Sequence, residues 1–487
     1  MSFVDPVYVV FLAVVFSVNW ALARHLRAQN LWLLLVSLVF YGWIHPWMIG
    51  LLLASALLDY VAALGIARDQ ETGGTGGRWM ALSAIGNVGA LAGFKYFNFF
   101  EAAFVAALQK VGFDAHPTTL QVFLPIGLSF YTFQTMAYTI DVWRKQLTAR
   151  TNLTDFLVFV ALFPQLVAGP VERASNLLAQ VETPRRFNLD QVTSGLSLAL
   201  FGAFKKVVIA DTMAPYVNIL YQAENPSWTM IWAACLGFSI QVLADFSGYT
   251  DMARGSARML GFELMENFRH PYLASSPMDF WTRWHISFST WLRDYVYLPS
   301  CFSPWVDRWI RLPFVGELSP FWVTARALLI TMFLSGLWHG STWNYIVWGL
   351  YYAVIGTVWA GIYERIPRKT RKQRDWRPIL VPVMFVHTLV GMQIFREPDL
   401  ARLWSHLTTS PFAGTADQHI VAAGMLAMCA AGAAPLLLAL LWEQRIAPRL
   451  EASALRLPMQ TTAWAVCAVL LVTFYRSTNN DFVYFQF

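Results

Sequence analysis

His339 is an ionisable side chain at the boundary between two apolar stretches of the sequence, in segment 334–344. A charged or titratable group in such a place is costly unless it faces a cavity or a polar partner. Imidazole exchanges a proton near neutral pH, which suits a general base in a transfer reaction. A neutral imidazole that bonds a backbone carbonyl is the alternative, and position alone leaves both interpretations open.

Small and aromatic residues surround His339. Gly336 and Gly340 allow backbone or substrate to approach closely, and Trp338 and Trp343 are placed to wall a narrow channel. Glycines also serve ordinary helix packing in membranes. These neighbours therefore support a site without specifying its chemistry.

A second histidine, His285, lies in a segment of different character. Between residues 278 and 298, aromatic and apolar side chains recur every three or four residues, and four charged residues lie off that stripe. The pattern predicts an amphipathic helix that lies at the membrane interface or dips into the protein interior without crossing the bilayer. His285 is on the apolar stripe, where a structural bond to Ser289 or a carbonyl fits the sequence as well as a catalytic role does.

The two histidines stand without the partners that mark several other classes of site. The sequence contains no serine nucleophile elbow, HExxH motif or P-loop. Its four cysteines are scattered, with no spacing that suits zinc. Asp59 and Lys95, isolated in other apolar stretches, are better explained by a buried structural pair or by a lysine that reaches the interface. We therefore predict a histidine-centred site without a metal ion, inside a membrane.

The composition indicates that lipid is the solvent for most of the chain. Of the 487 residues, 57% are apolar and 13% are charged, whereas soluble domains are about one quarter charged. The 22 Trp, 36 Phe and 18 Tyr suit helix ends at membrane interfaces. The formal charge of +6 is spread between apolar stretches and forms no groove or stripe, which argues against nucleic acid as a partner.

Apolar stretches of about the 20 residues needed to cross a bilayer recur along the chain. They lie near 4–23, 47–67, 79–97, 120–142, 228–250, 322–338, 343–363, 378–395, 420–442 and 462–475, with shorter stretches near 31–44, 155–170 and 193–213. We predict an all-α integral membrane protein with about ten to twelve transmembrane helices, plus re-entrant or interfacial amphipathic helices. The whole chain, 1–487, is expected to be one polytopic domain.

The distribution of positive charge predicts the orientation of the chain. Arg24 and Arg27 follow the first apolar stretch and no positive charge precedes it, so we interpret the stretch as a retained helix and not as a cleaved signal peptide. Seven Lys or Arg side chains lie between residues 365 and 377. By the positive-inside rule this loop is cytoplasmic, and both termini lie on the opposite side.

Nine motifs give the chain a resemblance to a known family. In order they are LVFYGW at 38–43, KYFNFF at 95–100, LPIGLSFYTFQ at 124–134, FPQLVAGP at 163–170, DFSGYTDMA at 245–253, NFRHPY at 267–272, FWTRWHISFSTWLRDY at 280–295, GLWHG at 336–340 and VYFQF at 483–487. With these motifs the chain resembles the membrane-bound O-acyltransferase (MBOAT) superfamily, in its alginate O-acetyltransferase-like bacterial polysaccharide branch. The resemblance covers nearly the whole chain.

The resemblance implies a fold and a reaction. The helices would surround a central funnel in which a thioester donor from the cytoplasm meets an acceptor from the other side. His339 would be the catalytic histidine and His285 its second, supporting histidine. The implied donor is acetyl-CoA, used as a substrate without any bound cofactor. The implied acceptor is an exported polysaccharide, reached directly or through a periplasmic acetyl-transferring partner, and the implied location is the cell inner (cytoplasmic) membrane.

One segment departs from the family pattern. After Pro299 the family continues with a short, glycine-rich basic loop, whereas this chain has an apolar, proline-containing segment up to Pro320. Because the segment lies between the two histidines, contacts with the donor or a partner are the part of the resemblance that it does not support.

Two other functions stay open at this point. One is transfer of an aminoacyl or other acyl group from a carrier protein to a cell-envelope polymer, which differs in whether free acyl-CoA suffices as donor. The other is a transporter, because multi-pass proteins with buried charges often move solutes. A transporter would be favoured by inverted repeats with interrupted helices, and none is evident in the sequence.

Overall fold

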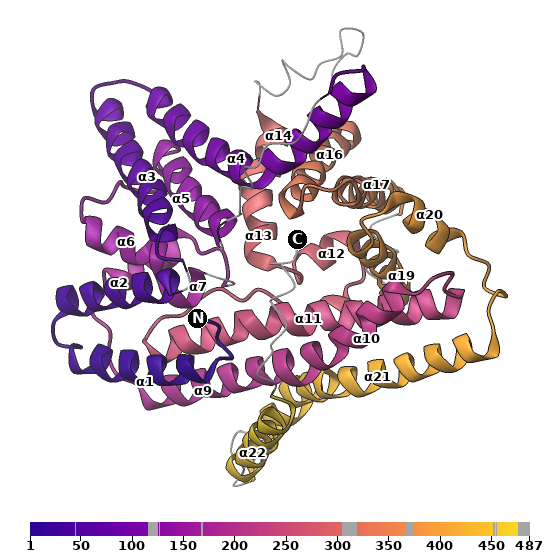
Figure 1. Ribbon diagram of the computed structural model, residues 1–487. Helices are drawn as coiled ribbons and strands as arrows, with labels where there is room; N and C mark the ends of the chain where they lie inside the picture. The colour runs from indigo at the N-terminus through magenta and orange to yellow at the C-terminus, as the bar shows by residue number, and fades with distance from the viewer. Residues whose placement is uncertain are drawn as a thin grey trace. The chain divides into compact units, whose positions relative to one another are not determined.

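The computed structural model describes residues 1–43, 45–114, 125, 127–166, 169–303, 319–366, 375–450, 453 and 455–475. Within these ranges every regular element is a helix (Figure 1). The predicted all-α fold class is therefore confirmed. Residues 304–318 of the atypical segment, residues 367–374 of the basic loop and the motif at 483–487 lie outside the described ranges.

The helices follow one another with short connections. The elements up to residue 222 are α1 (Pro6–Ala21), α2 (Leu26–Gly42), α3 (Met48–Glu71), α4 (Gly77–Lys110), α5 (Leu128–Trp143), α6 (Leu153–Ala161), α7 (Phe163–Leu166), α8 (Ala174–Val181), α9 (Leu189–Phe204), the π-helical turn η1 (Lys205–Ala210) and α10 (Asp211–Gln222). The later elements are α11 (Trp228–Met259), η2 (Pro271–Leu273), α12 (Pro277–Trp281), α13 (Ile286–Leu292), η3 (Arg293–Tyr297), α14 (Leu298–Phe302), α16 (Pro320–His339), α17 (Trp343–Arg365), α19 (Arg377–Arg396), α20 (Leu400–Thr408), α21 (Ala416–Leu441), η4 (Trp442–Ile446), η5 (Ala447–Arg449) and α22 (Arg456–Phe474).

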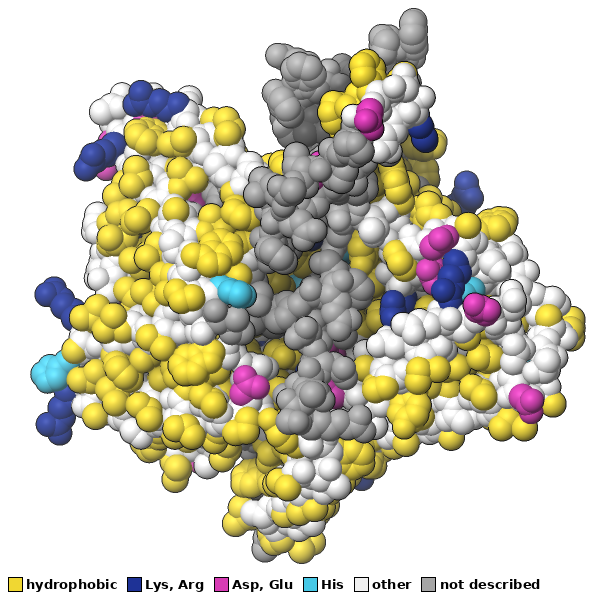
Figure 2. All heavy atoms as spheres, in the orientation of Figure 1, with side chains coloured by type: hydrophobic (Ala, Val, Ile, Leu, Met, Phe, Trp, Pro, Cys, Tyr) yellow, Lys and Arg dark blue, Asp and Glu magenta, His cyan; other side chains and the backbone are white. Residues whose placement is uncertain are grey.

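Eight helices in the described part of the chain are long and apolar enough to cross a membrane. They are α3, the continuous stretch Leu189–Gln222, α11, α16, α17, α19, the stretch Ala416–Arg449 and Leu457–Phe474. Helices α1 and α2 are shorter and also apolar. Apolar side chains cover much of the visible surface (Figure 2), as expected of a chain whose solvent is lipid. The expectation of an integral membrane protein is confirmed.

The chain forms two compact units. Unit 1 comprises Met1–Ala199 and Tyr249–Glu266, and unit 2 comprises Leu200–Gly248 and Asn267–Phe487. The boundaries fall within α9 and α11. The expectation of one functional domain over 1–487 stays a prediction.

In unit 1, α3 packs against α4 and α5, and a buried carboxylate joins the three helices. Asp59 of α3 is fully buried and accepts hydrogen bonds from Ser83 and Asn87 of α4 and from Thr139 of α5. The Asn87 and Thr139 donors lie 2.7 and 2.8 Å from the carboxylate oxygens. Because a buried carboxylate is stabilised by such donors, Asp59 has a structural role, as the sequence suggested.

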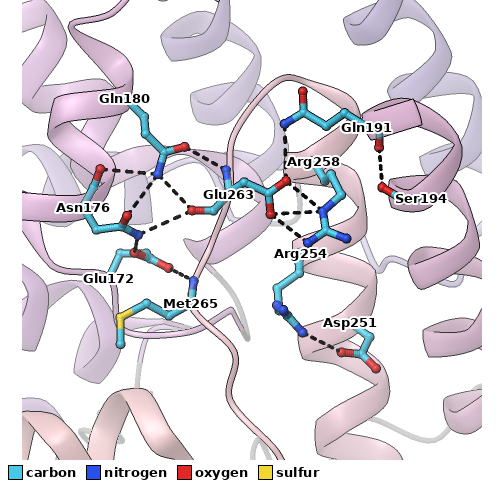
Figure 3. Close-up of polar contacts among 10 residues, drawn as sticks. All are labelled: Glu172, Asn176, Gln180, Gln191, Ser194, Asp251, Arg254, Arg258, Glu263 and Met265. Atoms are coloured by element: carbon cyan, nitrogen blue, oxygen red, sulfur yellow. Dashed lines mark hydrogen bonds and ion pairs between the residues drawn. The ribbon is translucent and has the colours of Figure 1, made fainter. Parts of the chain in front are cut away.

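A second polar cluster of unit 1 lies outside the membrane-spanning helices (Figure 3). Glu172 accepts hydrogen bonds from the backbone N–H of Met265 and from the side-chain amide of Asn176. The Gln180 side chain donates to the Glu263 carbonyl at 2.9 Å and accepts from the Glu263 N–H at 2.8 Å. These contacts attach α8 to the chain that follows α11. Burial raises the pKa of Glu172 to about 7, against the lowering effect of its two hydrogen bonds.

The raised pKa of Glu172 predicts a pH-dependent stability. The folded chain holds this proton more tightly than the unfolded chain, in which the pKa is 4.5, so stability falls as the pH rises from about 4.5 to about 7. Glu172→Gln keeps the neutral form at every pH. Its melting temperature should exceed that of wild type at pH 8, and the difference should shrink at pH 5. Glu224→Gln, at an exposed position, is the matched control, and an equal effect of Glu172→Gln at both pH values would contradict the assignment.

In unit 2, α16 and α17 form a closely packed pair. A Cβ atom added to Gly336 would lie 2.3 Å from the carbonyl oxygen of Tyr345, and one added to Gly349 would lie 2.3 Å from that of Met332. The two backbones therefore approach as only glycines allow. This contact fixes the end of α16, where His339 is its last residue.

A buried ion pair lies elsewhere in unit 2. The amine of Lys206, with its side chain 1% exposed, lies 2.8 Å from a carboxylate oxygen of Asp211 and 2.9 Å from one of Asp245. Lys206 belongs to the π-helical turn η1, whereas Asp245 belongs to α11. The ion pair compensates the desolvation of the charges and joins the two helices.

The prediction of one amphipathic helix over 278–298 is wrong. The chain forms α12, turns through residues 282–285, restarts as α13 and continues through η3 into α14. The break is at His285, whose backbone is left-handed (φ 44°, ψ 53°). Hydrophobic periodicity cannot reveal it, because the apolar stripe continues across the break and glycine, the usual residue in that conformation, is absent. Each piece is too short to cross a bilayer.

Candidate active site

His339 ends α16 and lies at a sharp change of chain direction. Its side chain is buried, with 7% of the residue exposed. Gly340 follows in an extended conformation, and α17 begins three residues later at Trp343. A Cβ atom at Gly340 would lie 2.2 Å from the ring of Tyr345. The glycine therefore lets α17 turn back closely beside His339.

Aromatic rings from three helices surround the imidazole of His339. Trp348 of α17 and Phe395 of α19 both meet it edge-on, with centroid distances of 4.8 and 5.1 Å and interplanar angles of 82° and 83°. The neighbouring ring of Trp338 lies at 4.8 Å. Packing by these rings restricts the orientations of the imidazole.

His339 lines a cavity with an empty volume of about 350 Å³. The lining side chains are otherwise aromatic or aliphatic, and they are Val242, Phe280, Trp281, Trp284, Trp348, Tyr352, Met392 and Phe395. Within this lining, His339 is the group that exchanges a proton near neutral pH. An apolar cavity with one convergent polar group has the character of a small-molecule or catalytic site. Its low polarity strengthens electrostatic interactions inside it.

The structure brings His285 near His339 without placing it on the cavity wall. His285 is 1% exposed, and its ring contacts Phe246 at 4.8 Å and Phe288 at 5.1 Å. Phe288 stacks on Trp338 at 4.1 Å, and both of these rings also contact His339. Two aromatic side chains thus connect the histidines.

Burial lowers the pKa of His285 to about 3. Its imidazole is consequently neutral at physiological pH. A neutral, buried ring suits hydrogen bonding and shaping of the site better than proton exchange. Such a ring is compatible with the supporting role that the resemblance implies, and it lacks the exposure that a proton-transfer group requires.

The expected walls of the site are only partly correct. Trp338 packs against His339 but does not line the cavity, and Trp343 is 60% exposed. The cavity walls come instead from α11, α12, α17 and α19. Trp348 and Phe395 were missed because aromatic residues are frequent throughout this chain, so their types carry no signal of a site. Position within the 3.6-residue period relative to His339 is the signal that could have found Trp348.

A known family matches the part of the chain that contains both histidines. Residues 143–395 match the model of the MBOAT, membrane-bound O-acyltransferase family. The chain is 38% identical over 378 residues to the "Probable alginate O-acetylase AlgI" of Azotobacter vinelandii, covering 78% of this chain and 72% of that protein.

Two further relatives have other named activities. The "Peptidoglycan O-acetyltransferase" of Helicobacter pylori is 31% identical, over 78% of this chain and 73% of that protein. The "Teichoic acid D-alanyltransferase" of Bacillus subtilis is 27% identical, over 55% of this chain and 68% of that protein. The family model spans more than half of the chain and ends at Phe395 of the cavity wall. This chain is therefore an O-acyltransferase and belongs to the membrane-bound O-acyltransferase family.

Proposed function

We propose that this enzyme moves an acetyl group from a cytoplasmic thioester donor, acetyl-CoA, towards an exported polysaccharide, with His339 as the general base. The observation that carries the proposal is the imidazole of His339 on the wall of an otherwise apolar cavity. The names of the relatives support acetyl as the group and a polysaccharide as the acceptor, because alginate O-acetylase and peptidoglycan O-acetyltransferase proteins share more than three tenths of their aligned residues with this chain.

In the proposed reaction, the imidazole of His339 takes the proton of an acceptor hydroxyl. The acceptor oxygen forms a bond to the thioester carbonyl carbon, and the carbon–sulfur bond then breaks. The imidazolium returns the proton to the leaving thiolate, so the products are an ester and a thiol. A positioned base contributes about a hundred- to ten-thousandfold to such a rate. The apolar cavity excludes water and so limits hydrolysis of the thioester.

His285 is proposed to support this reaction through the rings of Phe288 and Trp338. These two side chains lie between the histidines, and each contacts both of them. In this proposal His285 shapes the site and holds the rings, and His339 exchanges the proton.

The proposed setting is the cell inner membrane. A multi-pass chain there can meet acetyl-CoA on the cytoplasmic side and pass the acetyl group to a polysaccharide, or to a periplasmic acetyl-transferring partner, on the other side. The basic loop at 365–377 supports this orientation.

Transfer of an aminoacyl group from a carrier protein is the second candidate. The relative named teichoic acid D-alanyltransferase favours it, although this relative is less similar and covers less of the chain than the acetylases do. The two candidates differ in the donor that suffices.

The proposal is tested with purified enzyme in lipid vesicles and acetyl-CoA labelled in the acetyl group. We expect labelled ester to form on an added polysaccharide acceptor, and acetyl esters on exported glycans to fall in cells that lack the enzyme. Transfer that requires an acyl-charged carrier protein, with none from acetyl-CoA, would instead support the second candidate. Unchanged glycan esters in the deletion strain would contradict the polysaccharide acceptor.

A further inference from the structure

Asn344 is a buried amide whose hydrogen bonds join the two chain segments beside His339. It is the second residue of α17 and is 1% exposed. Its Nδ2 donates to the carbonyl oxygens of Ile394 at 3.2 Å and Phe395 at 2.9 Å. Its Oδ1 accepts a hydrogen bond from the hydroxyl of Thr342 at 2.5 Å. One side chain thus connects the turn that follows His339 with the end of α19.

The two carbonyls that Asn344 binds are in the last turn of α19, which ends at Arg396. The last four carbonyls of a helix have no donor within the helix, and a buried one needs a donor from elsewhere. Asn344 supplies two such bonds from a different helix. The amide therefore fixes the backbone of Phe395 relative to the first turn of α17.

The ring of Phe395 transmits this position to His339. It meets the imidazole edge-on at 5.1 Å and packs against Tyr345 at 5.0 Å. Trp348 contacts the imidazole from α17. A displacement of the last turn of α19 would move Phe395 away from Trp348 and loosen the packing that restricts the imidazole.

We propose that Asn344 is a positioning residue that acts through Phe395 to hold the imidazole of His339 in its reactive orientation. The proposal rests on the proposed role of His339 as general base. Asn344 lies outside the cavity lining, so it is not proposed to touch substrate. Its effect should appear in the rate of the chemical step and not in the binding of the donor.

The first test compares steady-state kinetics of Asn344→Ala, Asn344→Asp and wild type, per mole of folded enzyme in lipid vesicles. The carboxylate introduced by Asn344→Asp would still accept from Thr342 but would turn an oxygen towards the two carbonyls. Both substitutions should lower kcat by about tenfold, as expected for a misplaced catalytic group, and change the KM for acetyl-CoA by less than about twofold. Thr331→Val, which removes one buried hydrogen bond from α16, is the control and should keep the wild-type kcat.

The second test is a double-mutant cycle with Phe395→Leu, which keeps the Asn344 bonds and removes the ring. Phe395→Leu alone should also lower kcat, and Asn344→Ala should add little to it. This arm remains informative if Asn344→Ala fails to fold. A wild-type kcat for Phe395→Leu, additive effects in the cycle, or a loss confined to protein abundance would overturn the positioning role. Activity retained by His339→Gln would instead overturn the proposed function itself.

Discussion

Replacing His339 with glutamine is expected to lower the rate of acyl transfer by about a hundredfold or more, because the amide keeps much of the size and hydrogen bonding of imidazole but cannot take up a proton. His339→Ala should have at least as large an effect. The measurement is label transferred from acetyl-CoA per mole of folded enzyme. The chain should remain inserted and folded, since the proposed role of the imidazole is proton transfer and not packing.

The comparison with His285 separates proton transfer from packing. His285→Ala should reduce transfer less than His339→Ala, because the ring of His285 lies behind Phe288 and Trp338 and not on the cavity wall. All variants need to be compared at matched membrane abundance, since loss of folded protein imitates loss of catalysis. Near-normal turnover by His339→Gln at that abundance would sink the mechanism and leave the fold assignment intact.

Gly336→Ala is expected to cause the largest loss of stability among single-methyl substitutions at the site. The added Cβ would lie 2.3 Å from the carbonyl oxygen of Tyr345 and 3.1 Å from its carbon. Overpacking costs about 1–3 kcal/mol, and a backbone atom cannot move aside as a flexible side chain can. We expect a clearly lower melting temperature and, because α16 carries His339, a lower transfer rate by the enzyme that remains folded.

Gly424→Ala provides the matched control for this substitution. Gly424 is also helical, in α21, but an added Cβ meets no atom within 4 Å. Where a helix can accommodate the methyl group, the exchange of glycine for alanine stabilises by about 0.4–1 kcal/mol. The melting temperature should therefore stay the same or rise. Equal destabilisation by the two substitutions would show that the α16–α17 contact is not the cause.

Hydrophobic stretches predicted the helices of this chain closely. The stretch predicted at 343–363 corresponds to α17 at Trp343–Arg365, and that at 378–395 to α19 at Arg377–Arg396. This agreement has a physical reason, since an apolar segment in lipid must satisfy its backbone internally and becomes a helix. His339 stood out because an ionisable group in such a segment is costly.

Other features depend on contacts that a linear pattern does not contain. The helix break at His285 arises from one left-handed residue whose type does not require that conformation. Trp348 and Phe395 resemble many other aromatic residues of the chain until the fold places them at the imidazole. The partners of Asn344 lie 50 and 51 positions away in sequence. Sequence therefore predicted the ionisable centre and the spans, but not the rings that hold the centre.

The buried ion pair of Lys206 has a consequence for the order in which the chain enters the membrane. A lysine at the centre of a membrane helix costs about 2.5–3.5 kcal/mol during insertion. Asp211, in the same stretch Leu189–Gln222, offers one counter-charge, but it is itself a charge to be inserted. Asp245 arrives only with α11, which begins at Trp228. During synthesis, the stretch Leu189–Gln222 thus gains its full stability in lipid when α11 follows it, so the two segments enter the bilayer as a cooperative pair.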